Sequence, residues 1–267
     1  MPTPPTILER LNKKIERAEK HLIDLSEMVQ KFITSDEPYE IVSYDDSDIL
    51  RKVFKVNILK NFPLDMAVII GDVLQNLRST LDHLAFHLVS IGPPAKRATL
   101  IYFPIFESAA LYEAGKMRKI LGMALPAIKA IDAIQPYKGG KGHALWNLQT
   151  MNNRDKHSLL VPAWMSVIGR TLYRSERATI EVALKETFPA GLPEGIMAAT
   201  PGINFLEDGA VLTTVPFSEL DNHMDFRIHI AFEDPPDVRG KEVMATLYEI
   251  RDAVTRTVAI FGAKGLL

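Results

Sequence analysis

Polar side chains gather on one face of the stretch from Leu64 to Ser90, which contains no proline and is expected to form a helix. On a helical wheel at about 100° per residue they fall within an arc of roughly 80°. This polar stripe consists of Asp72, Asn76, Ser79, His83 and His87, and it is flanked by Gln75, Arg78 and Asp82. Carboxylates, imidazoles and a guanidinium are the groups that acid–base catalysis and anion binding require. The stripe is therefore the first candidate site.

His83 and His87 are spaced so that both imidazoles can reach one metal ion from a single helical face. A carboxylate or a third histidine from elsewhere would complete the ligand set of a divalent metal. The motif His-Glu-x-x-His, which would strengthen this interpretation, is absent. The alternative, which we favour, is that the histidines are solvated or satisfy buried partners. No other cofactor is expected.

Arg78 and Asp82 are also four residues apart, the spacing of an ordinary ion pair within a helix. Such a pair contributes little to stability when it is exposed. Asn76 and His83 lie in the same short segment, and so many polar groups are costly on a helix that must also pack. If the group is buried, its members must form a satisfied hydrogen-bond network.

A second polar cluster follows the predicted helix that carries Trp146. It runs Asn152-Asn153-Arg154-Asp155-Lys156-His157 and precedes the apolar residues Leu159 to Val161. Side chains at such a junction often face a cleft. In the simpler alternative this is a solvated helix end, with Lys156 and His157 complementing the helix dipole.

The two clusters together define one proposed site. Its candidate catalytic residues are Arg78, Asp82, His83, Asp155, Lys156 and His157. Asn76 and Asn153 are the candidate ligand-binding residues. In this hypothesis a histidine acts as a base, a carboxylate orients it, and Arg78 or Lys156 holds an anion.

The same residues resemble the paired motifs of an uncharacterised bacterial protein family. The segment Asn76–Leu84 resembles "NLRSxLDHL", and Leu145–Leu160 resembles "LWxLxxxxNxDKHxLL". The similarity spans roughly residues 64–161. It brings no known activity, and it implies only that the two clusters belong to one recurrent design and meet in space.

A looser resemblance is to the HEPN ribonucleases, helical RNA-cleaving domains whose active site has an arginine followed four to six residues later by a histidine. Arg78 and His83 have that spacing. The resemblance implies a dimeric, metal-independent ribonuclease with these two residues catalytic. Here, however, the pair sits in mid-helix about 140° apart on the wheel, and a β-rich half follows.

The surrounding pattern predicts an α+β fold in which a layer of long helices packs on a mainly antiparallel sheet. Helices are expected at 6–34, 64–90, 109–121, 125–134, 144–153 and 240–262, and strands in a hairpin at 38–60 and at 165–168, 179–184, 211–215 and 226–232. We expect a single domain over 1–267, with a helical part at roughly 1–160, a β-rich part at 161–235 and a C-terminal helix.

Composition narrows the classes of protein. The formal net charge is −2, so there is no overall positive field, and nucleic acid is not the expected partner. Cysteine is absent, and no signal peptide or membrane anchor is visible, so a cytoplasmic protein is expected. The first helix has a heptad-like apolar seam, which makes a homodimer through that helix one expectation.

Three functions stay open at this stage. The first is a small-ligand protein or metal-assisted enzyme, the second an HEPN-like ribonuclease, and the third a non-catalytic, self-associating interaction protein.

Overall fold

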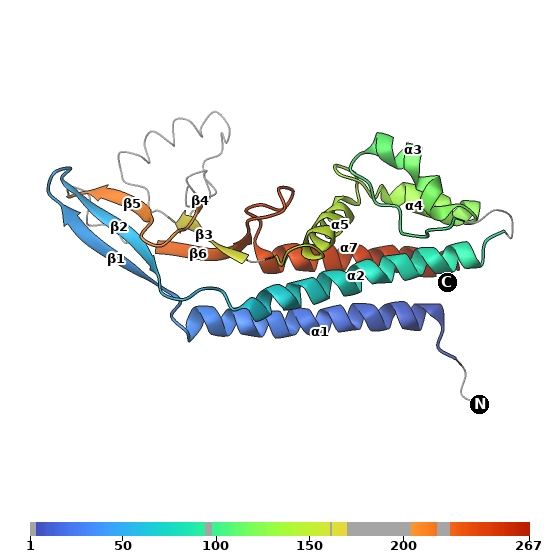
Figure 1. Cartoon of the computed structure of the whole chain (residues 1–267), viewed down its shortest axis with the longest axis horizontal. Helices are drawn as coiled ribbons and strands as arrows, with labels where there is room; N and C mark the ends of the chain where they lie inside the picture. Colours follow the sequence, from blue (N-terminus) through green and yellow to red (C-terminus); the bar gives the residue numbers. More distant parts are fainter. Residues whose placement is uncertain (1–3, 94–97, 161, 170–203, 218–224) are drawn as a thin grey trace, which may run out of the picture. The chain divides into compact units, whose positions relative to one another are not determined.

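The chain forms two compact units in the computed structural model, which describes residues 4–93, 98–160, 162–169, 204–217 and 225–267 (Figure 1). The helical unit comprises Met1–Lys31, Pro63–Pro162 and Phe232–Leu267. The strand unit comprises Phe32–Phe62 and Ala163–Ala231. The sequence predicted a single domain over 1–267, and whether these two units form one domain stays a prediction. All of the candidate site residues belong to the helical unit.

The predicted helices are confirmed to within three residues at each end, and the largest difference is at the start of α7. They are α1 (Ile7–Thr34), α2 (Leu64–Ser90), α3 (Ala109–Ile120), α4 (Leu125–Ile134), α5 (His143–Asp155) and α7 (Val243–Ala263). The last turn of α1 belongs to the strand unit.

Helix α2 is the centre of the helical unit. Its predicted apolar stripe is fully buried, with Ile70, Leu74, Leu77 and Leu81 each at 0% exposure. Helices α5 and α7 pack against α2 and against each other, and α1 runs along α2 on the side away from α5 (Figure 1). An α-helix surrounded in this way has few solvent-facing positions. They include Asp72 and His83 of the polar stripe, but also the apolar Val68 and Phe86.

Helix α1 begins with a capping box. The Thr6 hydroxyl accepts a hydrogen bond from Glu9 N at 3.2 Å, and Glu9 Oε2 accepts one from Thr6 N at 2.7 Å. The apolar seam is buried within the single chain, including Leu11, Leu22 and Leu25. Arg251 of α7 pairs with Glu19 of α1 at 3.2 Å. Self-association of the chain stays a prediction, and it would need residues outside this buried seam.

The strand unit contains the predicted hairpin. Strands β1 (Tyr39–Asp46) and β2 (Arg51–Ile58) pair antiparallel, and β2 also pairs antiparallel with β5 (Val211–Pro216). A second sheet has the order β4 (Asn204–Phe205), β3 (Pro162–Gly169), β6 (Asp225–Phe232). The strand expected at 179–184 lies outside the described residues. Helices with antiparallel strands and a C-terminal helix confirm the α+β class.

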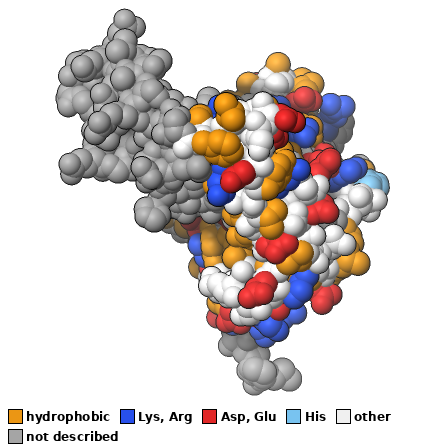
Figure 2. All heavy atoms as spheres, turned by 90° about the vertical axis from the view of Figure 1, so that its left-hand side faces the viewer, with side chains coloured by type: hydrophobic (Ala, Val, Ile, Leu, Met, Phe, Trp, Pro, Cys, Tyr) orange, Lys and Arg blue, Asp and Glu red, His pale blue; other side chains and the backbone are white. Residues whose placement is uncertain are grey.

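The surface drawn in Figure 2 mixes acidic and basic side chains, which lie beside one another across that face. This arrangement agrees with the formal net charge of −2, and the described residues on that face form no extended basic track of the kind that binds a phosphate backbone. Within the described part of the chain, no helix has the length and apolar character needed to cross a membrane.

Candidate functional site

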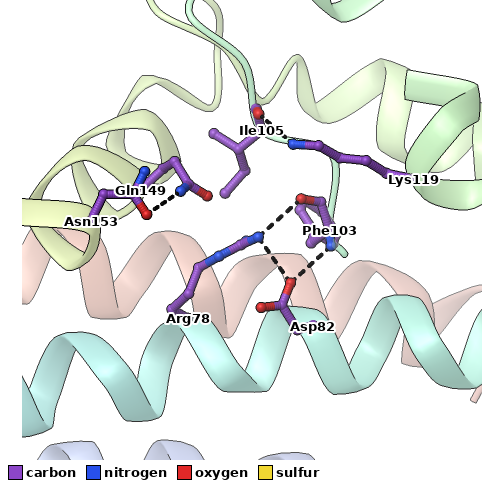
Figure 3. Close-up of polar contacts among 7 residues, drawn as sticks. All are labelled: Arg78, Asp82, Phe103, Ile105, Lys119, Gln149 and Asn153. Carbon is purple, nitrogen blue, oxygen red and sulfur yellow. Dashed lines mark hydrogen bonds and ion pairs between the residues drawn. The ribbon is translucent and has the colours of Figure 1, made fainter. Parts of the chain in front are cut away.

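Arg78 and Asp82 clamp the backbone of one residue, Phe103. Arg78 is 6% exposed, and its Nη2 lies 2.9 Å from Asp82 Oδ1. The same Nη2 donates to the Phe103 carbonyl at 3.3 Å, and Asp82 Oδ1 accepts from the Phe103 N–H at 2.9 Å (Figure 3). The pair thereby satisfies both backbone polar groups of Phe103 and fastens the segment before α3 onto α2.

Additional cations lie close to the clamp. Burial raises the pKa of Asp82, and this outweighs the opposing effects of Arg78, the Phe103 N–H, Lys156 and Lys119. Burial, aided by Arg78, lowers the pKa of Lys119, whose ammonium donates to the Ile105 carbonyl at 3.3 Å (Figure 3). The structure thus brings Lys156, from the second predicted cluster, within electrostatic range of Asp82 in the first.

The two predicted amides are engaged within their own helices. Asn76 Nδ2 donates to the Asp72 carbonyl at 2.8 Å. Asn153 Oδ1 accepts from Gln149 Nε2 at 2.9 Å on α5 (Figure 3). A ligand at either amide would have to replace these contacts, and the ligand-binding role of Asn76 and Asn153 stays a prediction.

The end of α5 lies against α2 at Gly71, five residues before the first motif. A Cβ built on Gly71 would lie 2.6 Å from Asp155 Oδ2, so glycine at this position leaves room for the carboxylate. Asp155 is the last residue of α5, where a negative charge opposes the helix dipole. Its Oδ1 is buried and has no hydrogen-bond partner in the described part of the chain. Burial, and then Asp72, raise the pKa of Asp155.

This placement makes Asp155 costly at neutral pH. A carboxyl whose pKa is raised on folding is disfavoured in its ionised form, so its cost is absent below the ordinary aspartate pKa, grows as pH rises above it and is complete above the folded pKa. We expect Asp155→Asn to stabilise the protein at pH 7 by about 0.5 kcal/mol, the scale of a charge at a helix terminus. The gain should vanish below the ordinary aspartate pKa, near pH 3. Urea unfolding at both pH values tests this, and an equal gain at both would contradict it.

His83 and His87 face a different part of the surface, a groove between α2 and the first turns of α1. The groove has a volume of about 560 Å³. Its lining residues are Ile7, Arg10, Asp82, His83, Phe86, His87, Ser90 and Ile101. Burial lowers the pKa of both histidines, with a further lowering from Lys14 for His83 and from Arg10 for His87. Both imidazoles are therefore neutral at pH 7, able to donate one hydrogen bond and accept another.

The structure thus divides the predicted set of site residues. Asp82 belongs to both the clamp and the groove, Lys156 acts on Asp82, and Asp155 lies against Gly71. His157 is exposed, and its backbone N–H donates to the Arg154 carbonyl at 3.0 Å. The catalytic roles of all six candidate catalytic residues stay predictions.

The metal and ribonuclease expectations gain no support from these positions. No group of three His, Asp or Glu residues able to hold a metal ion occurs in the described ranges. Arg78 is buried against Phe103, whereas His83 is exposed and lines the groove. Both expectations stay predictions.

Sequence reasoning missed several residues of the groove, notably Arg10, Phe86 and Ile101. One signal was present: Phe86 is a large aromatic residue placed off the apolar stripe, and it is 61% exposed. Arg10 and Ile101 carry no comparable signal, since only the packing of their segments beside α2 brings them there.

Comparisons with protein-family models, with curated proteins and with solved structures gave no match. The function must therefore be inferred from the geometry of the groove.

Proposed function

We propose that the protein binds a small amphipathic molecule in the groove between α1 and α2. The observation that carries this proposal is the composition of the groove. An exposed Phe86 and the side chains of Ile7 and Ile101 share one concavity with His83, His87 and Arg10. Ligand sites typically combine such apolar walls with a few polar groups that fix orientation.

The size of the groove agrees with this function. Its volume of about 560 Å³ falls within the usual range for small-molecule sites, roughly 300–1,000 Å³. Asp82 is held by Arg78 at 2.9 Å, so one wall of the groove is fixed before a ligand arrives. Preorganisation of this kind reduces the entropic cost of binding.

A neutral fluorescent probe tests the proposal. We expect N-phenyl-1-naphthylamine to bind the wild-type protein and Phe86→Ala to weaken it about tenfold, because an aromatic contact contributes about 0.5–1.5 kcal/mol beyond the area that it buries. Phe86 is mostly exposed, so its loss should leave the fold intact.

The matched control is Ile260→Ala. Ile260 lines a second groove of about 440 Å³ between α4 and the end of α7. Probe affinity unchanged by Ile260→Ala and lowered by Phe86→Ala supports the proposal. Equal affinities in all three proteins, or no binding, would rule out the α1–α2 groove as the site.

A further inference from the structure

We infer that the ligand of the α1–α2 groove is a monocarboxylate, held by Arg10 at its charged end and by Phe86 at its apolar end. This inference rests on the proposed small-ligand function and adds the chemical class of the ligand.

The first support is that Arg10 has unused donors. Its Nε donates to the Pro5 carbonyl at 3.1 Å, which anchors the side chain at the start of α1. Among the described residues no carboxylate pairs with its guanidinium, and its two Nη groups have no hydrogen-bond partner. A guanidinium presents its N–H groups as a planar fork that matches a carboxylate.

The second support is the charge balance around the groove. Asp82 is the acidic residue that lines it, and the buried Arg78 offsets its charge at 2.9 Å. Glu9, one residue before Arg10, turns its carboxylate to Thr6 at the start of α1, where the positive end of the helix dipole offsets part of its negative charge. Arg10 and the nearby Lys14 therefore leave an excess of positive charge, which a negative ligand would complement.

The third support is the position of the neutral histidines. His83 and His87 line the groove together with Arg10 and Phe86. A neutral imidazole can donate a hydrogen bond to a carboxylate oxygen. The apolar side chains of Phe86 and Ile101 suit the aromatic or aliphatic body of the same molecule.

A pair of probes with nearly the same size and shape, one charged and one neutral, tests the inference. We expect 4-phenylbutanoate to bind the wild-type chain about tenfold more tightly than 4-phenylbutanamide, the ratio given by one charge-assisted hydrogen bond. Arg10→Gln should remove this preference, because it lowers the affinity for 4-phenylbutanoate and leaves the affinity for 4-phenylbutanamide unchanged. Isothermal titration calorimetry measures both affinities.

The matched control is Arg17→Gln, which removes the same charge from the same helix. Arg17 lies seven residues further along α1, about 10 Å away along the helix axis. The Arg17→Gln variant should keep the preference for the carboxylate at 0.15 M salt, because the screening length there is about 8 Å, shorter than this distance.

The outcomes separate the two proposals. Equal binding of both probes by the wild type would overturn the carboxylate inference and leave the small-ligand function standing. Binding of neither probe, together with no binding of N-phenyl-1-naphthylamine, would overturn both. Tighter binding of phenyl phosphate than of 4-phenylbutanoate, or loss of preference in Arg17→Gln as well, would also count against a carboxylate held by Arg10.

Discussion

Replacing Asp82 by asparagine is expected to destabilise the protein by about 3 kcal/mol, the lower end of the cost of breaking a buried ion pair. The substitution preserves an oxygen that can accept the Phe103 N–H but leaves the Arg78 guanidinium, 6% exposed, without its counter-ion. We take the lower end because the Asp82 side chain is 24% exposed. Urea-induced unfolding followed by circular dichroism measures the change.

A control for this prediction is the exposed pair Lys13–Glu16, whose side chains are 77% and 55% exposed. Glu16→Gln should leave the free energy of unfolding almost unchanged, because water screens a pair as exposed as this one. The double variant Arg78→Met, Asp82→Leu leaves no buried charge unpaired but removes the acceptor of the Phe103 N–H, so we expect a loss of similar size to that of Asp82→Asn. If Asp82→Asn is as mild as Glu16→Gln, the clamp does not stabilise the helical unit.

Gly92→Ala is expected to have an effect of similar size. Gly92 follows α2, and a Cβ built on it would lie 2.0 Å from the carbonyl oxygen of Gly122 and 3.3 Å from the Ala124 N. Both atoms belong to backbone, which gives way at higher cost than the end of a side chain. We expect a loss of about 3 kcal/mol, the upper end for overpacking, measured as a lowered urea midpoint with an unchanged m-value.

The same substitution in α7 should act in the opposite direction. A Cβ on Gly262 would meet nothing within 4 Å, and the residue lies in the last turn of α7. Gly262→Ala should therefore stabilise the protein by up to about 1 kcal/mol through helix propensity and reduced freedom of the unfolded chain. Two glycine-to-alanine changes of the same sign would contradict the close contact at Gly92.

The bounds of α2 could be predicted from sequence because its signals agree. Leu64–Ser90 lacks proline, has apolar residues at helical spacing and is followed by a Gly-Pro-Pro stop signal. The hairpin could be predicted equally well, since alternating β-branched and aromatic residues flank an Asp-rich turn. In that turn Asp46 Oδ1 accepts a hydrogen bond from Asp48 N at 3.1 Å. The spacing of apolar residues along the chain shows which face of an element is buried. Helices and strands with a regular pattern of this kind can therefore be predicted from the sequence alone.

The candidate site was predicted less completely, for a physical reason. A helical wheel shows which side chains share a face, but not which neighbouring segment covers them. Arg78 and Asp82 turn toward Phe103, whereas His83 turns toward α1. No pattern in 98–106 predicts that its backbone would be held by these two side chains. Asp155 lies beside Gly71, five residues before the first motif, and the expectation that the two motifs meet stays a prediction.

The helical unit draws its residues from both ends of the chain, since it needs Met1–Lys31 as well as Phe232–Leu267. During synthesis, α1 and α2 emerge from the ribosome long before α7. Until then, the surface of α2 that α7 covers has no native partner, and Glu19 lacks Arg251. We expect the nascent helices to stay open to chaperones and proteases until α7 has been synthesised, so that a chain truncated before Val243 would be rapidly degraded.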